Sequence, residues 1–439
     1  MIEVLLGILG AIIFFLCLAL PLQHRLLLVL VCTVPQLYLV QLGGSDVPLA
    51  FLLPALLLPE FFKSANVFLA KPTSISLLLL IGISTVSLYW SVDKSMGIRD
   101  IAYYIEFIII SCSVYYLASN NREVLYKIIN IMLFAVCLQA VTIIMFRLDE
   151  QLELSIVLSH VSNYLMGPNV LSGLLNGVRN NFYDPVKAGG VLFINANAAA
   201  CYVGVCAFMA WGIFKVHKSR ISLLMALFLW ISVFFTGSKA GVLFAVLIPL
   251  FVFYLKLNKN SRLVVTLAGG TFALLLIMVA VVSGIVEQHG FLHQSTETAE
   301  TRYQIWSYAL GEFIKNPIMG QGFGGWKVDY SKHTDYFLPP HNTLIYLWSK
   351  SGVLASLMGV AFMLACVKVA LRAISNITNE EQKNIGYTLL MVLLWQFAHG
   401  FGENFGLIGE QHQMIALAVM LGLGIAGNTP MRKYNKEIK

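Results

Sequence analysis

The residues that could do chemistry in this sequence gather in one polar segment, residues 287–342, which lies between apolar stretches. The segment contains Arg302 and Trp306, and it ends in Pro340-His341-Asn342 directly before the next apolar run. A guanidinium offers bidentate hydrogen bonds to phosphate oxygens, and an imidazole changes charge near neutral pH. These side chains, placed where a membrane meets water, suit a reaction on a lipid-linked anion.

The order of residues within this segment predicts how the side chains are held. Residues 300–313 place apolar side chains at helical spacing, and Asn316-Pro317 should end that helix. A glycine-rich run follows at 320–325 and permits tight turns, while Pro339-Pro340 stiffens the chain before His341. The alternative reading makes Arg302 a solvated charge and His341 an interfacial helix cap.

A second candidate is Lys239, which lies between two apolar runs with almost no loop. A cation near hydrocarbon is costly unless it is paired or hydrated. Lys239 is therefore either an anion ligand, with Thr236 and Ser238 as neighbouring donors, or a lysine that reaches the surface from a tight turn.

The third group lies around the end of the other long connection, residues 147–190. Arg179 and Lys187 supply positive charge there, and Asn195 and Asn197 lie at the start of the following apolar run. Two asparagines two residues apart point to different sides of a helix, so at least one should bond within the bundle or to a ligand.

Further polar residues in or near the apolar runs are weaker candidates. Among them Glu403 could reach the same vestibule as His341. A zinc site built on His333 and His341 lacks an obvious third ligand. The others are Glu106, Gln396, His399, Glu410 and His412.

The composition places the chain in the membrane class. Of 439 residues, 58% are hydrophobic and 12% are charged, against about 25% charged in soluble domains. Runs of apolar residues without strand-like alternation predict an all-α polytopic membrane protein with twelve to fourteen transmembrane helices. The seven cysteines all fall in apolar runs and are expected to be packing residues. The net charge of +7 is spread over short loops, which does not indicate nucleic-acid binding.

The expected spans also predict an orientation. The first run lacks a basic leader and a cleavage site, so we expect a retained helix, and the second and third spans are short enough to be re-entrant instead. Basic connections alternate along the chain and should face the cytoplasm, which puts residues 147–190 and 287–342 outside.

The alanines and Gly204 of one span and Gly422, Gly424 and Gly427 of the last indicate tight helix packing. The expected spans are 2–22, 26–42, 47–62, 73–90, 101–118, 124–146, 191–214, 221–237, 240–256, 263–286, 343–371, 386–402 and 408–427.

The motifs together resemble the signature region of the O-antigen ligase and O-antigen polymerase (Wzy-type) superfamily. The resemblance covers roughly residues 187–425 by motif and rests mainly on two segments: Asn-Pro-Ile-Met-Gly-Gln-Gly-Phe-Gly at 316–324 and His-Asn-Thr-Leu-Ile at 341–345. Weaker support comes from Arg302-x3-Trp306, from residues 236–241, from 190–197 and from Gly-Val-Leu at 352–354.

This resemblance implies a helical bundle of the membrane glycosyltransferase type (GT-C-like), capped by periplasmic helical loops. It divides the chain into residues 1–186, with the N-terminal helices and first long loop, and residues 187–439, with the motifs and the catalytic loop 287–342. The implied setting is a bacterial inner membrane with the active site facing the periplasm.

The implied activity is transfer of a glycan from undecaprenyl diphosphate to a sugar hydroxyl, with no metal or other cofactor. His341 matches the family's essential histidine and Arg302 its loop arginine, whereas Lys239 stands where the family usually has arginine. Lysine keeps the charge but loses the fork that fits phosphate, so Arg179 and Lys187 become expected helpers. Asn195, Asn197, Trp306, Asn342 and Glu403 would line the substrate vestibule.

The acceptor stays open between another lipid-linked repeat, which makes a polymerase, and the lipid A core, which makes a ligase. The ten residues between Arg179 and Gly190 favour the polymerase, whose partners would include membrane lipid and a chain-length regulator protein. A transporter or flippase of lipid-linked glycans is the alternative, and it predicts midplane charges and internal symmetry. A non-catalytic scaffold would leave the Pro-Pro-His-Asn segment unexplained.

Overall fold

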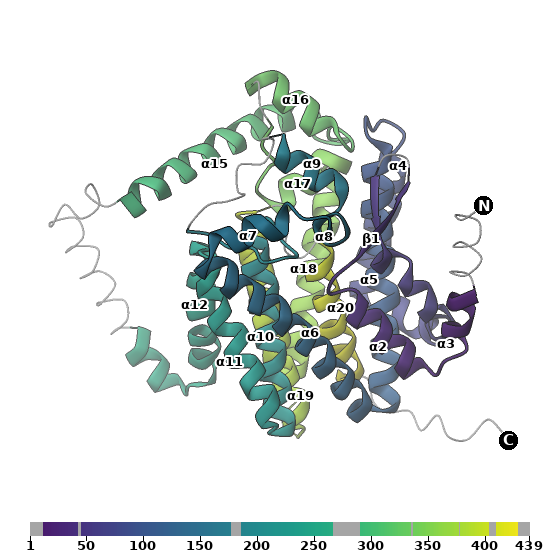
Figure 1. Ribbon diagram of the computed structural model, residues 1–439. Helices are drawn as coiled ribbons and strands as arrows, with labels where there is room; N and C mark the ends of the chain where they lie inside the picture. The colour runs from purple at the N-terminus through teal and green to yellow at the C-terminus, as the bar shows by residue number, and fades with distance from the viewer. Residues whose placement is uncertain are drawn as a thin grey trace.

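The computed structural model describes residues 12–42, 45–176, 186–266, 290–334, 337–376, 378–403 and 410–428. The chain forms a helical bundle with one two-stranded hairpin among the described residues (Figure 1). The prediction of an all-α polytopic membrane protein is confirmed. The elements are α2 (Leu22–Cys32), β1 (Tyr38–Leu42), β2 (Ser45–Pro48), η1 (Leu49–Phe51), η2 (Leu53–Leu57), α3 (Leu58–Leu69), α4 (Pro72–Ser87), α5 (Lys94–Asn120), α6 (Arg122–Leu148), α7 (Glu150–Val157), α8 (Val161–Leu165), α9 (Pro168–Leu175), α10 (Ala196–His217), α11 (Arg220–Phe235), α12 (Lys239–Lys256), α15 (Gly290–Lys315), α16 (Gly325–Thr334), α17 (Thr343–Ser351), α18 (Val353–Ile374), α19 (Glu380–Gly400) and α20 (Gln411–Asn428).

Six helical stretches in the described residues are long and apolar enough to cross a membrane, and four shorter apolar helices accompany them. The predicted total of twelve to fourteen spans remains a prediction. Most of the expected span at 263–286, and half of the first one, lie outside the described residues.

The predicted span at 26–42 is wrong. Helix α2 ends at Cys32, and the chain then turns back as the antiparallel β1–β2 hairpin. Pro35 lacks an N–H and disfavours helix at the residue before it, and Gln36 and Leu37 both adopt positive φ angles. Apolar composition alone does not reveal this break. The following stretch, Leu49–Leu69, is a spanning candidate that begins in 3₁₀ turns.

Small residues let the central helices approach closely, as the sequence predicts. A Cβ on Gly204 of α10 would lie 2.4 Å from the ring of Trp395 in α19. A Cβ on Gly422 of α20 would lie 2.4 Å from the carbonyl oxygen of Ser111 in α5. Any side chain at these positions would force the helices apart.

Both long connections lie at one end of the bundle. Helices α7, α8 and α9 belong to the first, and α15 and α16 to the second; all of them lie toward the top of Figure 1. The junction of α5 and α6 lies at the opposite end, where Arg122 pairs with Glu381 at the start of α19. His217, at the end of α10, approaches Glu123 there.

The glycine-rich run is held between two helix junctions. Its Phe323 accepts a hydrogen bond from Asp93 N at 2.8 Å and donates to Ser91 Oγ at 2.9 Å, both before α5. On the other side, Gln321 N donates to Ser349 O at 2.8 Å in α17. Gly320 has φ +66°, and a Cβ on it would lie 2.1 Å from a backbone oxygen of Trp348. The glycine-rich run is therefore packed between the start of α5 and the end of α17, which fixes the position of the segment leading to His341.

Candidate active site

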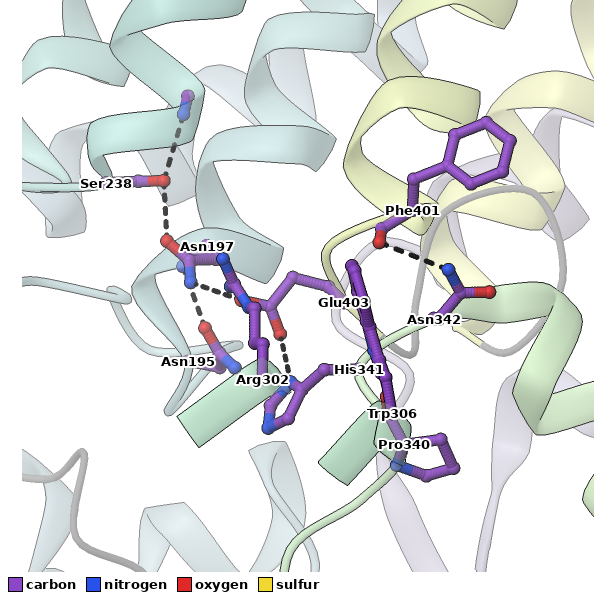
Figure 2. A network of polar contacts seen from close by, with 11 residues as sticks. Asn195, Asn197, Ser238, Arg302, Trp306, Pro340, His341, Asn342, Phe401 and Glu403 are labelled. Atoms are coloured by element: carbon purple, nitrogen blue, oxygen red, sulfur yellow. Dashed lines mark hydrogen bonds and ion pairs between the residues drawn. The ribbon is translucent and has the colours of Figure 1, made fainter. Parts of the chain in front are cut away.

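Three polar side chains from distant parts of the sequence converge on the carboxylate of Glu403 (Figure 2). His341 Nδ1 lies 3.0 Å from Glu403 Oε2, Arg302 Nη2 lies 3.3 Å from Oε1, and Asn197 Nδ2 donates to Oε1 at 2.7 Å. Only 6% of the Glu403 side chain is exposed, against 24% for His341 and 33% for Arg302. A buried carboxylate thus holds a partly exposed imidazole and a partly exposed guanidinium side by side.

Local sequence fixes each of these side chains. Arg302 projects from α15, and Trp306 of the same helix donates from Nε1 to Pro340 O at 3.2 Å. His341 follows the two prolines and adopts φ +49°, a left-handed conformation that costs energy in a non-glycine residue. Asn342 then caps α17 through Leu344 N and Ile345 N, and its Nδ2 donates to Phe401 O at 3.3 Å.

The two asparagines at the start of α10 make different hydrogen bonds, and Asn197 bonds within the bundle, as expected for at least one of the pair. Asn195 is the N-cap, and its side chain accepts from Asn197 N at 2.8 Å. The side chain of Asn197 bonds to Glu403 with its amide nitrogen and accepts from Ser238 Oγ at 2.6 Å with its oxygen. Ser238 in turn caps α12 through Gly241 N at 3.1 Å.

This chain of contacts brings the predicted lysines to the same neighbourhood. Lys239 is the residue after Ser238, lies at the first position of α12 and is exposed. Ala188 N donates to Thr236 O at 3.0 Å, and a Cβ on Gly237 would lie 3.2 Å from the Cα of Lys187. Lys187 is therefore beside the same turn and is half-buried. Arg179 lies outside the described residues.

The charges around Glu403 define its state. Burial alone would raise the pKa of the carboxyl, but the hydrogen bond from His341 and the charges of His341 and Arg302 outweigh it, so that the pKa falls below its ordinary value. An ionised carboxylate can only accept hydrogen bonds, so Nδ1 of His341 must carry a proton. In the neutral form of the imidazole the lone pair is then on Nε2, which is the arrangement of a general base.

Sequence reasoning gave Glu403 only a place in the vestibule, whereas the structure puts it at the centre. The separation of 62 residues between it and His341 hides the pairing in the sequence. His399 is nearly completely buried one turn earlier in α19, where Trp395 Nε1 donates to its Nδ1 at 3.3 Å. The sequence feature that could have pointed to His399 and Glu403 is their spacing of four residues at the end of an apolar run.

The remaining weak candidates lie elsewhere. Glu106 accepts from Gln411 Nε2 at 2.7 Å between α5 and α20, and His412 bonds Glu410 at 2.7 Å and Val34 O at 2.9 Å. His333 stacks on Tyr308 instead of approaching His341. In the part of the chain that the structure describes, no three His, Cys, Asp or Glu side chains lie together as a metal site would require.

Fold and site together define a multi-pass membrane protein with a charged site at one end of its helical bundle. The family model described as O-antigen ligase matches residues 223–360. This match confirms the resemblance to the O-antigen ligase and polymerase superfamily and indicates an enzyme of the O-antigen ligase or polymerase type, which transfers glycosyl groups. A search of curated proteins gave no match. The matched range contains Lys239, Arg302 and His341 but excludes Asn197 and Glu403, which complete the cluster in space.

Proposed function

We propose that this protein is an inverting glycosyltransferase that moves a glycan from undecaprenyl diphosphate to a sugar hydroxyl. The observation that carries the proposal is the convergence of Arg302 and His341 on Glu403, although the three residues come from α15, from the segment before α17 and from the segment after α19. Cationic and basic groups held side by side match the two needs of the reaction, a stabilised leaving diphosphate and a deprotonated acceptor.

The donor side is built from positive charge and helix N-termini. Arg302 contacts Glu403 through Nη2, so other guanidinium donors can take phosphate oxygens. Helices α10, α12 and α17 all begin in the network around Glu403, with Asn195, Ser238 and Asn342 as their caps. Helix N-termini carry partial positive charge and favour phosphate. Lys239 and Lys187 would add to this field, and Arg179 is a further proposed ligand.

The acceptor side depends on His341 and its carboxylate. The acceptor oxygen attacks the anomeric carbon, its proton passes to Nε2 of His341, and the bond from that carbon to the diphosphate oxygen breaks. Attack from the face opposite the diphosphate inverts the anomeric centre. Glu403 stabilises the imidazolium that forms, as a buried carboxylate does in other histidine-dependent sites. The negative charge leaves with the diphosphate toward Arg302 and the lysines.

The side chains around these groups would form the vestibule for the sugars. Asn195 and Asn197 lie at the start of α10, Trp306 bonds the carbonyl of Pro340 before His341, and Asn342 follows His341 and bonds Phe401 O. Large apolar side chains on the outer faces of the bundle, such as Leu243 and Leu250 of α12, are exposed, as expected for contact with lipid and the polyprenyl chain. The reaction as proposed uses the activated donor alone and calls for no cofactor.

The setting we propose is the inner membrane of a bacterium, with the site facing the periplasm. The support is the position of the basic junctions, such as Arg122 and Arg220, at the end of the bundle away from His341. Between the two possible acceptors we favour another lipid-linked repeat over the lipid A core, and a chain-length regulator as a partner. The Arg179–Gly190 spacing is the ground for this choice.

The test supplies purified protein with lipid-linked repeat units, with and without lipid A core. Wild type should form polymer on the repeat units alone, whereas His341→Ala and Arg302→Ala should lose product by ~100-fold or more while remaining folded. Product only on lipid A core would make the protein a ligase. Full activity in His341→Ala would remove the proposed base, and transport of the lipid across a bilayer without any product would replace the enzyme by a transporter.

A further inference from the structure

An open groove of about 460 Å³ runs along α15 beside His333, which lies near the end of α16. Gln304, Tyr308, Gly311 and Lys315 follow one another at intervals of three or four residues, so one face of α15 forms most of the groove. The remaining lining residues are Tyr303, Ser307, Glu312 and His333.

The groove combines aromatic rings with planar polar groups. The Tyr308 ring stacks on His333, with centroids 4.8 Å apart and planes 26° from parallel, and Tyr303 is 72% exposed. Edge contacts from Tyr308 to Trp326 and Tyr330 fix its ring in place. Sugar rings present C–H faces that pack on aromatic rings and hydroxyls that bond to amides and carboxylates. A groove of this size and mixture suits a short stretch of polysaccharide.

Gly311 keeps the middle of the groove open. Glycine is among the poorest helix formers, yet Gly311 lies inside α15. No atom lies within 4 Å of the place where its Cβ would be, so packing does not require a glycine. Its absence of a side chain leaves the helix backbone bare within the groove, which permits close approach by a ligand.

The groove lies on the helix that carries Arg302, on another face of it. Gly311 lies nine residues after Arg302 along α15, or about 14 Å at the rise of an α-helix. We infer that this groove binds the sugar residues of the glycan that lie away from its reacting end. The inference rests on the proposed function and extends it by a second sugar-binding site outside the Glu403 cluster.

The test measures binding and not turnover. The probe is the surface polysaccharide of the source bacterium, released from its lipid by mild acid, titrated onto the full-length protein in detergent. Gly311→Leu fills the groove with a good helix former, and Gly82→Leu is the matched control, since Gly82 lies in α4 with no atom within 4 Å of its Cβ position. We expect Gly311→Leu to weaken binding about tenfold, with an unfolding temperature equal to or above wild type, and Gly82→Leu to bind as wild type does.

Equal binding by wild type and Gly311→Leu would overturn the inference. So would a loss of binding to glycan-free lipid vesicles in Gly311→Leu, since the groove would then be a lipid contact. A failure of the proposed function would be seen in the transfer assay, as absence of product from lipid-linked donors, and not in this binding assay. In His341→Ala the groove should still bind the polysaccharide, and Gly311→Leu should still weaken that binding.

Discussion

Glu403 illustrates how one residue can determine the state of its neighbours. A carboxylate that is almost fully buried is unfavourable unless it is paired and hydrogen-bonded. Here it is met by an imidazole, a guanidinium and an amide, and its own charge then fixes the proton of His341 on Nδ1. Removing the carboxylate should affect both stability and the basicity of Nε2.

The lowered pKa of Glu403 predicts a pH dependence of stability. Because the folded pKa lies below the unfolded value of ~4.3, ionised Glu403 stabilises the fold above that pH, and this contribution is lost as pH falls through the folded pKa. Glu403→Gln should therefore lower the unfolding temperature at pH 7, and its difference from wild type should shrink below about pH 4.

The control for this measurement is Glu380→Gln. Glu380 forms an exposed ion pair with Lys383 at the other end of the bundle, and such pairs contribute little. A difference between wild type and Glu403→Gln that stays constant down to pH 3 would show that the charge of Glu403 does not matter to the fold.

At the scale of elements, the site is a meeting point of helix starts. Ser238 is 1% exposed, caps α12 and also bonds Asn197, so one hydroxyl joins the N-terminus of α12 to the carboxylate network. Each capping interaction stabilises its own helix, and the shared contacts fix the helices relative to one another.

Ser238→Ala should separate these two roles when compared with Ser219→Ala. Ser219 caps α11 through Ser222 N at the other end of the bundle. Both substitutions should destabilise the protein by about 1 kcal/mol. Only Ser238→Ala should also slow glycan transfer, by about tenfold, because Asn197 then loses its orienting partner. Equal rates for the two variants would mean that the contact between α12 and Asn197 has no part in the reaction.

The elements also show how far the sequence could predict this molecule. Apolar runs and the Asn-Pro and Pro-Pro pairs predicted most helices around the site and the end of α15 before Asn316. The hairpin after Cys32 was missed because its first strand, Tyr38–Leu42, is as apolar as the end of a span. The bond between Asn197 and Glu403 was missed because nothing in one sequence marks a contact between residues 206 positions apart.

At the scale of the whole molecule, several basic helix junctions share one end of the bundle. The junctions that contain Arg122, Lys218 and Arg220 lie at one end of the bundle, and the Glu403 network lies at the other. By the positive-inside rule these junctions favour the orientation proposed above, with Arg302 and His341 on the outer side.

Labelling of introduced cysteines in intact cells tests this orientation. Lys332→Cys, on α16, should react with a membrane-impermeant maleimide added outside. Ser375→Cys, at the end of α18, should react only after the cells are permeabilised. Both positions are exposed in the structure, so access depends on the membrane alone. The reverse pattern would place the Glu403 network in the cytoplasm.

In the proposed reaction His341 and Glu403 act as one unit, and a double-mutant cycle on the rate of glycan transfer tests this most directly. His341→Ala should reduce the rate by ~10²–10⁴-fold, and Glu403→Gln by a smaller factor. If Glu403 works through the histidine, the double variant should be no slower than His341→Ala within about twofold. A rate in the double variant equal to the product of the two separate losses would contradict the account.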